Sequence, residues 1–183
     1  EETGLSGPVH NIFAGSDLGL VEAPHLFWRD GYYYLTTAEG GTGYDHAVTM
    51  ARSKDIIGPY ELHPNAHLIC HSNAPDHPIQ RTGHGQYVET PDGEFFHTFL
   101  MGRPITDANG KGRFCPMGRE TGIEQCIWKE GWLYLEQGGA LARETVPPPK
   151  AAQTAKRDVG IASVSRQYRA GRILDPEFRP DNC

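Results

Sequence analysis

The sequence of 183 residues predicts an all-β fold, and three observations lead to that prediction. A short pattern occurs three times, in which an apolar run leads to an acidic residue and a glycine and then to an aromatic-rich run. Glycine and proline are frequent, with 22 and 14 residues, which indicates many turns. Apolar residues show a helical spacing at most over residues 150–168, so little helix is expected.

Each copy of the pattern is expected to form a β-hairpin. Asp-Gly between alternating apolar runs is a strong hairpin signal, because type I′ turns need positive φ at both central residues, and Glu-Gly is a weaker form of it. A further strand pair is predicted over 47–62, where apolar and polar residues alternate before the chain turns through Gly58-Pro59. The three hairpins span 25–37, 86–100 and 126–137.

Repeated hairpins with aromatic residues suit either a β-sandwich or consecutive blades of a β-propeller. Long polar loops favour the propeller, because loops on one face of a propeller surround a central funnel. Residues 39–46, 71–85 and 118–121 could converge there, although each loop could also be a simple solvated turn. The propeller portion is expected to cover 1–143, followed by a proline-rich linker from 144 onward.

Charge and composition exclude several classes of partner. The net charge of −6 and the absence of a basic run argue against nucleic acid and anionic membranes. No apolar stretch approaches the roughly 20 residues that cross a bilayer, so a soluble protein is expected, secreted or cytoplasmic. No C-x-x-C spacing is present, so the cysteines are expected to be thiols or to form at most one disulfide. They are Cys70, Cys115, Cys126 and Cys183.

Several motifs follow one another in an order that resembles the later blades of glycoside hydrolase family 43, in its β-xylosidase and α-L-arabinofuranosidase branch. The motifs are GPVHNIF, EAPHL, DGYYYL, AEGGTGYDHAVTMARS, GPYE, NAPDHPIQ, TGHG and GRETG, between residues 7 and about 135. The resemblance implies a five-bladed propeller, of which this chain would hold about the last three blades. It also implies hydrolysis, with inversion, of xylose or arabinose linkages in oligosaccharides derived from xylan or arabinoxylan.

The resemblance makes Glu22 the general acid, as the glutamate of a Glu-(Gly/Ala)-Pro-His motif. A general acid must keep its proton near neutral pH, which burial among apolar groups favours. Val21, Ala23, Leu26 and Phe27 are expected to provide that setting, and Pro24 to hold Ala23 in an extended conformation. From the residues alone, a surface position at the start of an edge strand is the favoured interpretation of Glu22, and the ordered motifs reverse that preference.

Three further residues are expected by resemblance to contact the sugar. His84 matches a histidine near the propeller axis, Arg119 matches a substrate-contacting arginine, and Thr42 is a weaker candidate for lining the pocket. Tyr44 and His46 could line it too. No cofactor is needed for the chemistry, although Ca²⁺ or another divalent ion held near His84 is consistent with the resemblance.

The motif that carries the family's second catalytic carboxylate does not appear in this sequence. Inverting glycosidases place two carboxyl groups roughly 6.5–9.5 Å apart, and the family's base lies near the start of its first blade. The acids before Glu22 are Glu1, Glu2 and Asp17, and Asp17 matches no family position. The chain alone is therefore expected to have little or no activity. At the other end, 172–183 resembles the entry to the family's appended β-sandwich.

Two other classes stay open. A sugar-binding partial or degenerate propeller would keep the pocket without the chemistry. A metal-dependent hydrolase is suggested by His63, His67, His71, His77 and His84, but no H-E-x-x-H motif is present and His63 and His67 do not fall on a predicted helix. The preference for xylose or arabinose is not fixed by these motifs, and the full-length form is a candidate homo-oligomer.

Overall fold

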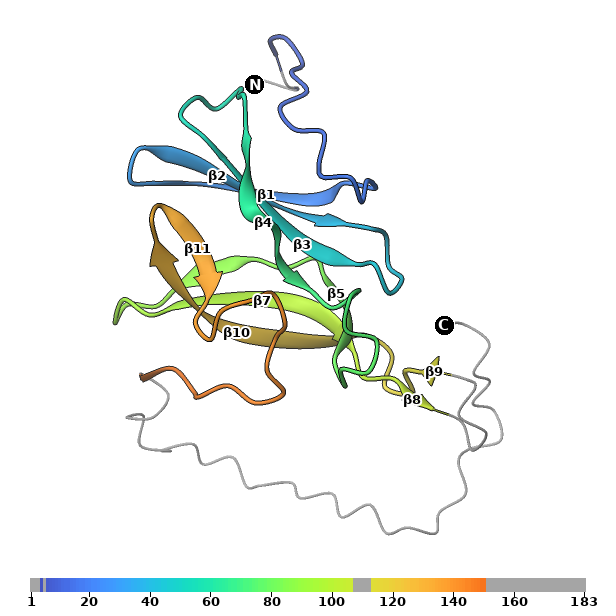
Figure 1. Ribbon diagram of the computed structural model, residues 1–183. Coiled ribbons are helices and arrows are strands. Elements are labelled where there is room, and N and C mark those ends of the chain that lie inside the picture. The colour runs from blue at the N-terminus through green and yellow to red at the C-terminus, as the bar shows by residue number, and fades with distance from the viewer. Residues whose placement is uncertain (1–3, 5, 107–112, 151–183) are drawn as a thin grey trace.

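A computed structural model describes residues 4, 6–106 and 113–150, and all the regular elements in them are β-strands. The all-β prediction is therefore confirmed for this part of the chain. Two antiparallel sheets pack against each other, and a small two-stranded ribbon lies beside the second sheet (Figure 1). Among the described residues, no helix is long and apolar enough to cross a membrane.

The first sheet has its four strands in sequence order. They are β1 (Glu22–Arg29), β2 (Tyr32–Glu39), β3 (Ala47–Ser53) and β4 (Glu61–Cys70). Arg29 pairs with Tyr32, which leaves Asp30 and Gly31 as a two-residue turn with φ values of 46° and 86°. The predicted Asp-Gly hairpin and the predicted strand pair over 47–62 are both present.

The second sheet has the order β11-β10-β7-β5, and β6 also pairs with β7. Its strands are β5 (Gln80–Gly83), β6 (Tyr87–Glu89), β7 (Phe95–Gly102), β10 (Glu120–Lys129) and β11 (Trp132–Leu135). The ribbon consists of β8 (Ile105–Thr106) and β9 (Arg113–Phe114).

The number of blade-sized sheets differs from the sequence prediction. The resemblance implied about three blades, whereas the described residues form two such sheets. The reason is that β10 pairs with β7, so the hairpins over 86–100 and 126–137 lie in one sheet. The expected linker is described only as far as residue 150, and the candidate helix and the resemblance at 172–183 fall outside the described residues.

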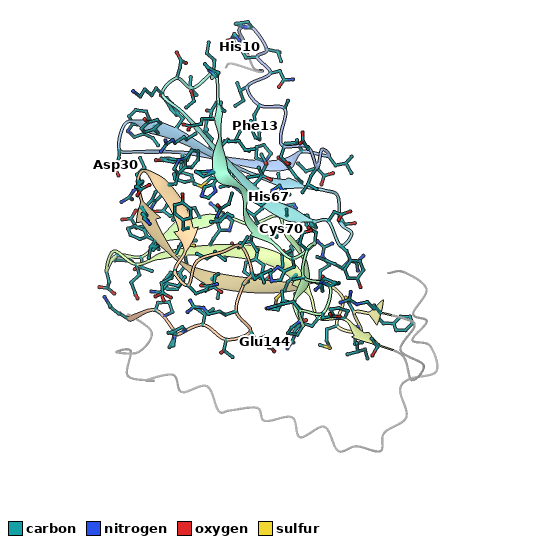
Figure 2. All side chains as sticks on the ribbon, viewed as in Figure 1. His10, Phe13, Asp30, His67, Cys70 and Glu144 are labelled. Carbon is teal, nitrogen blue, oxygen red and sulfur yellow. The ribbon has the colours of Figure 1, made fainter. Side chains whose placement is uncertain are left out.

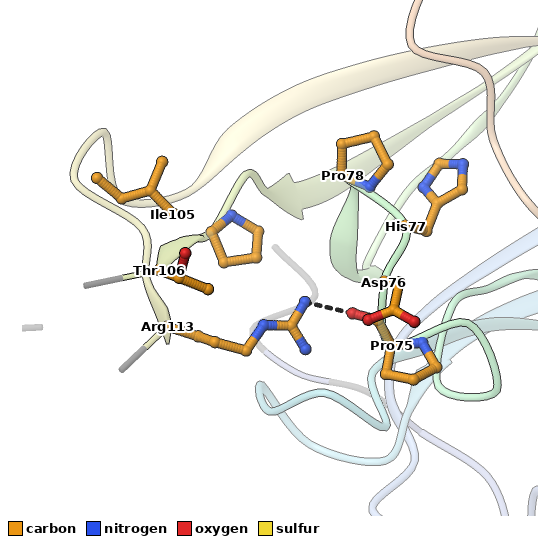
Figure 3. A pocket seen from close by; sticks show the side chains of 8 residues that line it. Pro75, Asp76, His77, Pro78, Ile105, Thr106 and Arg113 are labelled. Atoms are coloured by element: carbon orange, nitrogen blue, oxygen red, sulfur yellow. Dashed lines mark hydrogen bonds between the residues drawn. The ribbon is translucent and has the colours of Figure 1, made fainter. Parts of the chain in front are cut away.

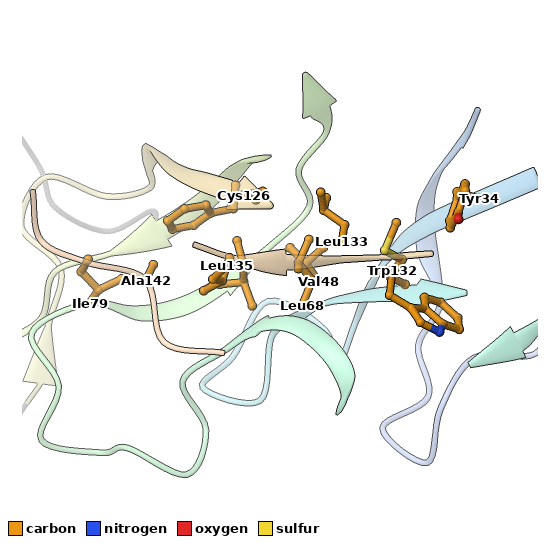
Figure 4. Packing of buried hydrophobic residues seen from close by; sticks show 12 residues of the cluster. Tyr34, Val48, Leu68, Ile79, Cys126, Trp132, Leu133, Leu135 and Ala142 are labelled. Carbon is orange, nitrogen blue, oxygen red and sulfur yellow. The ribbon is translucent and has the colours of Figure 1, made fainter. Parts of the chain in front are cut away.

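The core lies between the two sheets, where aromatic and aliphatic side chains from both pack together (Figure 4). Phe27 of β1 stacks on Tyr87 of β6 at 4.7 Å between ring centroids, and Tyr34 of β2 meets Trp128 of β10 at 4.8 Å. Such aromatic pairs contribute about 0.5–1.5 kcal/mol each beyond simple burial. Cys70, Cys115 and Cys126 are free thiols, as expected for the described cysteines.

Two arginines cross from the first sheet to the second. The guanidinium of Arg29 lies 5.0 Å from the ring centroids of both Phe95 and Trp128 and bonds the Glu89 carboxylate at 2.8 Å. Arg52 lies 4.0 Å from the Trp132 centroid and donates to the Gly131 carbonyl at 2.6 Å. These contacts fix how the sheets face each other, and with them the loops at the opposite ends of the strands.

Candidate functional site

Glu22 begins β1 at a β-bulge. Between the paired residues Glu22 and His25, two residues of β1 oppose the single residue Thr37 of β2. The first of the two, Ala23, has φ +47°, so the expectation of an extended Ala23 is wrong. Bulges bend a strand and turn a side chain away from the direction that regular pleating would give it. This bulge therefore sets the direction in which Glu22 leaves the sheet.

The side chain of Glu22 is exposed in this chain, so the expectation of an apolar shelter from its sequence neighbours is wrong. Val21 is 37% exposed and Leu26 is 43% exposed. Along β1 the exposed and partly buried residues alternate, and Glu22 and Leu26 both fall at exposed positions. Adjacent apolar residues in a strand do not enclose a charged neighbour, because successive side chains leave opposite faces.

The loop between β2 and β3 lies beside the start of β1. Gly40 donates its N–H to the Gly19 carbonyl at 3.0 Å, and Glu22 pairs with Ala38 at the end of β2. In this loop the side chain of Thr42 is exposed, whereas its carbonyl accepts a hydrogen bond from Arg81 Nε at 3.2 Å. The Thr42 backbone thus joins this loop to β5.

His84 occupies the break between β5 and β6, with an exposed side chain and φ +50°. The glycines on either side are needed for close packing. A Cβ on Gly83 would lie 2.2 Å from His46 Cδ2, and a Cβ on Gly85 would lie 1.6 Å from the carbonyl oxygen of Thr98. The backbone that carries His84 therefore lies directly against both the β2–β3 loop and β7.

Arg119, which comes just before β10, contacts His46 at the end of the β2–β3 loop. Its Nη2 lies 3.0 Å from His46 Nδ1. His46 is buried, and burial lowers its pKa to about 4, with further lowering by the nearby Arg119 cation. Burial and the Arg81 cation lower the pKa of Arg119. The three loops predicted to converge, over 39–46, 71–85 and 118–121, therefore meet through His46, Gly83 and Arg119.

A buried carboxylate, which the sequence did not single out, lies next to this edge of the first sheet. Glu39 is fully buried, and the backbone N–H of Ser16 donates to its Oε2 at 3.0 Å, with a second bond from the Ser16 hydroxyl. Thr37 adds a longer bond at 3.4 Å. The Glu39 carboxylate thus anchors the N-terminal segment through its hydrogen bonds with Ser16. The sequence gave no local signal of this contact, because the two residues are 23 positions apart.

Histidines of the central region have separate protein partners. His63 lies 3.0 Å from the Leu133 carbonyl, His67 lies 2.9 Å from Thr49 Oγ1, and His71 lies 3.0 Å from Thr82 Oγ1. Among the described residues, no group of three or more His, Cys, Asp or Glu side chains could hold a metal ion. The ion near His84 therefore stays a prediction.

A pocket of about 580 Å³ lies beside the converging loops (Figure 3). Its lining is rich in proline and comprises Pro75, Asp76, His77, Pro78, Pro104, Ile105, Thr106 and Arg113. Arg113 donates to the Pro75 carbonyl at 2.5 Å and lies 4.9 Å from the ring centroid of Tyr44. None of Glu22, Thr42, His84 and Arg119 lines this pocket, although four of its lining residues belong to the loop over 71–85.

Comparison with known proteins shows which protein family this chain resembles. The family model described as glycosyl hydrolases family 43 matches residues 1–133. The chain is 51% identical over 135 residues to xylosidase/arabinosidase 43B of Humicola insolens, covering 73% of this chain and 24% of that protein. It is 43% identical over 158 residues to the beta-xylosidase of Bacillus subtilis strain 168, covering 84% of this chain and 30% of that protein.

Solved structures give the same result. The crystal structure of xylan beta-1,4-xylosidase from Bacillus halodurans C-125 superposes with a TM-score of 0.74 at 47% identity, covering 79% of this chain and 27% of that one. The Bacteroides ovatus structure GH43B superposes with a TM-score of 0.64 at 37% identity, covering 75% of this chain and 26% of that one. The chain thus spans about a quarter to a third of the length of these relatives.

Proposed function

Because the chain belongs to glycosyl hydrolase family 43, we propose that it serves in hydrolysing O-glycosidic bonds of oligosaccharides derived from xylan or arabinoxylan, with inversion. Glu22 is the general acid that protonates the leaving oxygen. Arg119, His84 and Thr42 bind the sugar. The five-bladed propeller and the base belong to the full-length form, to which this chain contributes the acid and one side of the sugar cleft.

The observation that carries this proposal is the position of Glu22 at the bulge. The bulge places Glu22 at the end of β1 that adjoins the β2–β3 loop, and that loop contacts Gly83 and Arg119. A residue that donates a proton and residues that donate hydrogen bonds to hydroxyls are thus supplied from neighbouring loops, as glycoside hydrolysis requires.

Because Glu22 is exposed in this chain, other segments of the full-length form must supply the surroundings that keep a general acid protonated. A general acid must carry its proton when the leaving oxygen departs, and an exposed carboxyl group lacks the apolar cover that favours the protonated form. Further blades must therefore cover Glu22 or bring a carboxylate close to it, and either change raises the pKa of a general acid. The curated relatives have the additional length for such segments.

A chimera tests the proposal. In the Bacillus subtilis beta-xylosidase, the matched segment is replaced by this chain, and hydrolysis of xylobiose is measured. We expect the chimera to be active and the isolated chain to show little or no turnover of an aryl β-xyloside. In the chimera, Glu22→Gln should lower kcat/KM by about 10²- to 10⁴-fold, the usual contribution of general acid catalysis.

The matched control is Asp30→Asn, which removes an exposed carboxylate at the far end of β1, in the hairpin turn (Figure 2). Asparagine suits the positive φ of this turn, so activity should stay within about twofold of the parent chimera. Near-normal turnover by the isolated chain would refute the assignment of the base to another segment. Equal losses in both variants would refute the role of Glu22.

A sugar-binding module without catalysis is the second candidate, and the exposure of Glu22 favours it. In that case Glu22→Gln would leave xylose affinity unchanged and the chimera would be inactive with or without the substitution. An active chimera that depends on Glu22 excludes this alternative.

A further inference from the structure

The hydrogen bond between Arg119 and His46 fixes the protonation of the imidazole. A guanidinium group has only donors, so His46 Nδ1, 3.0 Å from Arg119 Nη2, must accept the hydrogen bond with its lone pair. His46 is therefore neutral and carries its hydrogen on Nε2. The backbone of Arg81 also acts on the ring and opposes part of the lowering of its pKa. The three groups that face His46 and affect its charge are Arg119, Arg81 and His84.

The imidazole is held in place from several sides. Only 3% of His46 is exposed, and the ring lies directly over Gly83, where a Cβ would come within 2.2–2.3 Å of Cδ2 and Nε2. Its backbone N–H donates to the Gly43 carbonyl at 3.3 Å, and the next residue, Ala47, begins β3 fully buried. His46 thus has little freedom to move away from Arg119.

Arg119 differs from other arginines of the molecule in the kind of partner it has. Arg29, Arg52, Arg103 and Arg143 each pair with a carboxylate. Arg81, Arg113 and Arg119 form no ion pair among the described residues, and Arg81 and Arg113 bond backbone carbonyls whereas Arg119 bonds an imidazole. The Nε of Arg119 is buried without a hydrogen-bond partner in this part of the chain. A carboxylate would have neutralised Arg119, but a neutral imidazole orients the guanidinium and leaves its full charge and its other N–H groups available to a ligand.

We propose that His46 is a positioning residue, which holds the Arg119 guanidinium in the orientation that binds the sugar while leaving its charge intact. The sugar-binding role of Arg119 rests on the proposed function, whereas the orientation of Arg119 by His46 does not. The sequence suggested His46 only as a residue that could line the pocket, and the structure places it behind Arg119, with its side chain buried.

Nuclear magnetic resonance of the full chain tests the orientation directly. The ¹⁵N shifts of His46 should report a neutral ring with hydrogen on Nε2, and the Arg119 Nε–H should be as ordered as the backbone on the nanosecond timescale. His46→Leu removes the acceptor at similar volume, so the Arg119 side chain should become mobile. His46→Asn places an amide oxygen on Cγ, the atom to which Nδ1 is bonded in histidine. This oxygen can accept the hydrogen bond from Arg119, so the variant should restore much of the order.

A purely structural histidine would not produce this pattern. His71→Leu is the control, because His71 is equally buried and bonds Thr82 and Ala142, away from Arg119. It should lower stability without changing the order of Arg119. A hydrogen on His46 Nδ1, or an Arg119 side chain equally ordered in His46→Leu, would overturn the inference.

Sugar binding separates this inference from the proposed function. With D-xylose as the probe, His46→Leu should weaken binding by about tenfold, the effect of about one well-placed hydrogen bond, and His46→Asn should recover most of it. If the parent chain binds no xylose, the proposed sugar contact of Arg119 fails, but the tautomer and the order of Arg119 still decide whether His46 positions it.

Discussion

At Ala23 the backbone takes a left-handed conformation, φ +47°, directly before a proline. Non-glycine residues in this region are strained by about 1–2 kcal/mol, and a following proline adds to the crowding. The strain occurs at the bulge beside Glu22, the proposed acid. Strained residues persist where the surrounding structure holds them, and such positions cluster at functional sites.

Replacing Ala23 with glycine should therefore stabilise the chain. We expect Ala23→Gly to raise the free energy of unfolding by about 0.5–1 kcal/mol, because glycine adopts positive φ without a Cβ clash. Ala14→Gly is the control, since Ala14 is exposed and has no positive φ, and it should be neutral or slightly destabilising. Urea denaturation of both variants measures the difference. A destabilised Ala23→Gly would argue against a strained bulge.

At the scale of the elements, two arginines that pair with carboxylates differ strongly in how far their side chains are buried. Arg29 of β1 lies between Phe95 and Trp128 of the second sheet and bonds Glu89, with 25% of its side chain exposed. Arg103 forms a pair with Glu120 and has 60% of its side chain exposed. Cation–π contacts gain strength when they are desolvated, whereas exposed ion pairs contribute little. The first arginine thus fastens one sheet to the other, and the second does not.

Substituting methionine at both positions tests this difference. Arg29→Met should lower the free energy of unfolding by about 1–3 kcal/mol, because it removes two cation–π contacts and a partly buried ion pair. Arg103→Met should change it by less than about 0.5 kcal/mol. Guanidinium denaturation monitored by tryptophan fluorescence gives both values. Equal losses would mean that the contacts of Arg29 do not hold the sheets together.

The pairing of the strands could be predicted only in part from the sequence. Asp30-Gly31 and Glu130-Gly131 mark two-residue turns because local backbone chemistry requires positive φ there, and both hairpins are present. The sheet that each hairpin joins depends on contacts between distant residues, such as Glu124 opposite His97, and the repeated pattern carries no information about them. For this reason the sequence pattern could not show that the second and third hairpins belong to one sheet.

The same limit applies to the candidate site. The convergence of the loops followed from their place at one end of the strands, and the contacts of His46 with Gly83 and Arg119 confirm it. The apolar residues next to Glu22 in the sequence do not shelter its side chain, because alternate residues of a strand face opposite sides. Neither the Ser16–Glu39 bond nor the neutral state of His46 has a local sequence signal, since each depends on a partner at least 23 residues away.

At the scale of the whole molecule, four buried histidines are neutral in the folded state. Burial lowers the pKa of each of them to about 4, from an ordinary value of 6.5. The residues are His46, His63, His71 and His97. Below pH 6.5 the unfolded chain takes up protons at these positions and the folded chain does not, so protonation favours unfolding.

The free energy of unfolding should therefore fall as the pH drops from 6.5 toward 4. Each histidine contributes a slope of up to about 1.4 kcal/mol per pH unit within this window, and none above it. Urea denaturation at intervals between pH 7.5 and 5.5 measures the slope before most carboxylates protonate. His63→Gln removes one of the four histidines and should reduce the slope. A stability that does not change across this range would contradict four neutral histidines.

The proposal that Glu22 donates the proton is tested most directly by how its loss depends on the leaving group. In the chimera with the Bacillus subtilis beta-xylosidase, kcat/KM of Glu22→Gln is compared with the parent on xylobiose and on 2,4-dinitrophenyl β-D-xyloside. Dinitrophenolate leaves without protonation, so the account predicts a loss of about 10²- to 10⁴-fold on xylobiose and a loss within about tenfold on the aryl substrate. The same large loss on both substrates would show that Glu22 does not act as the general acid.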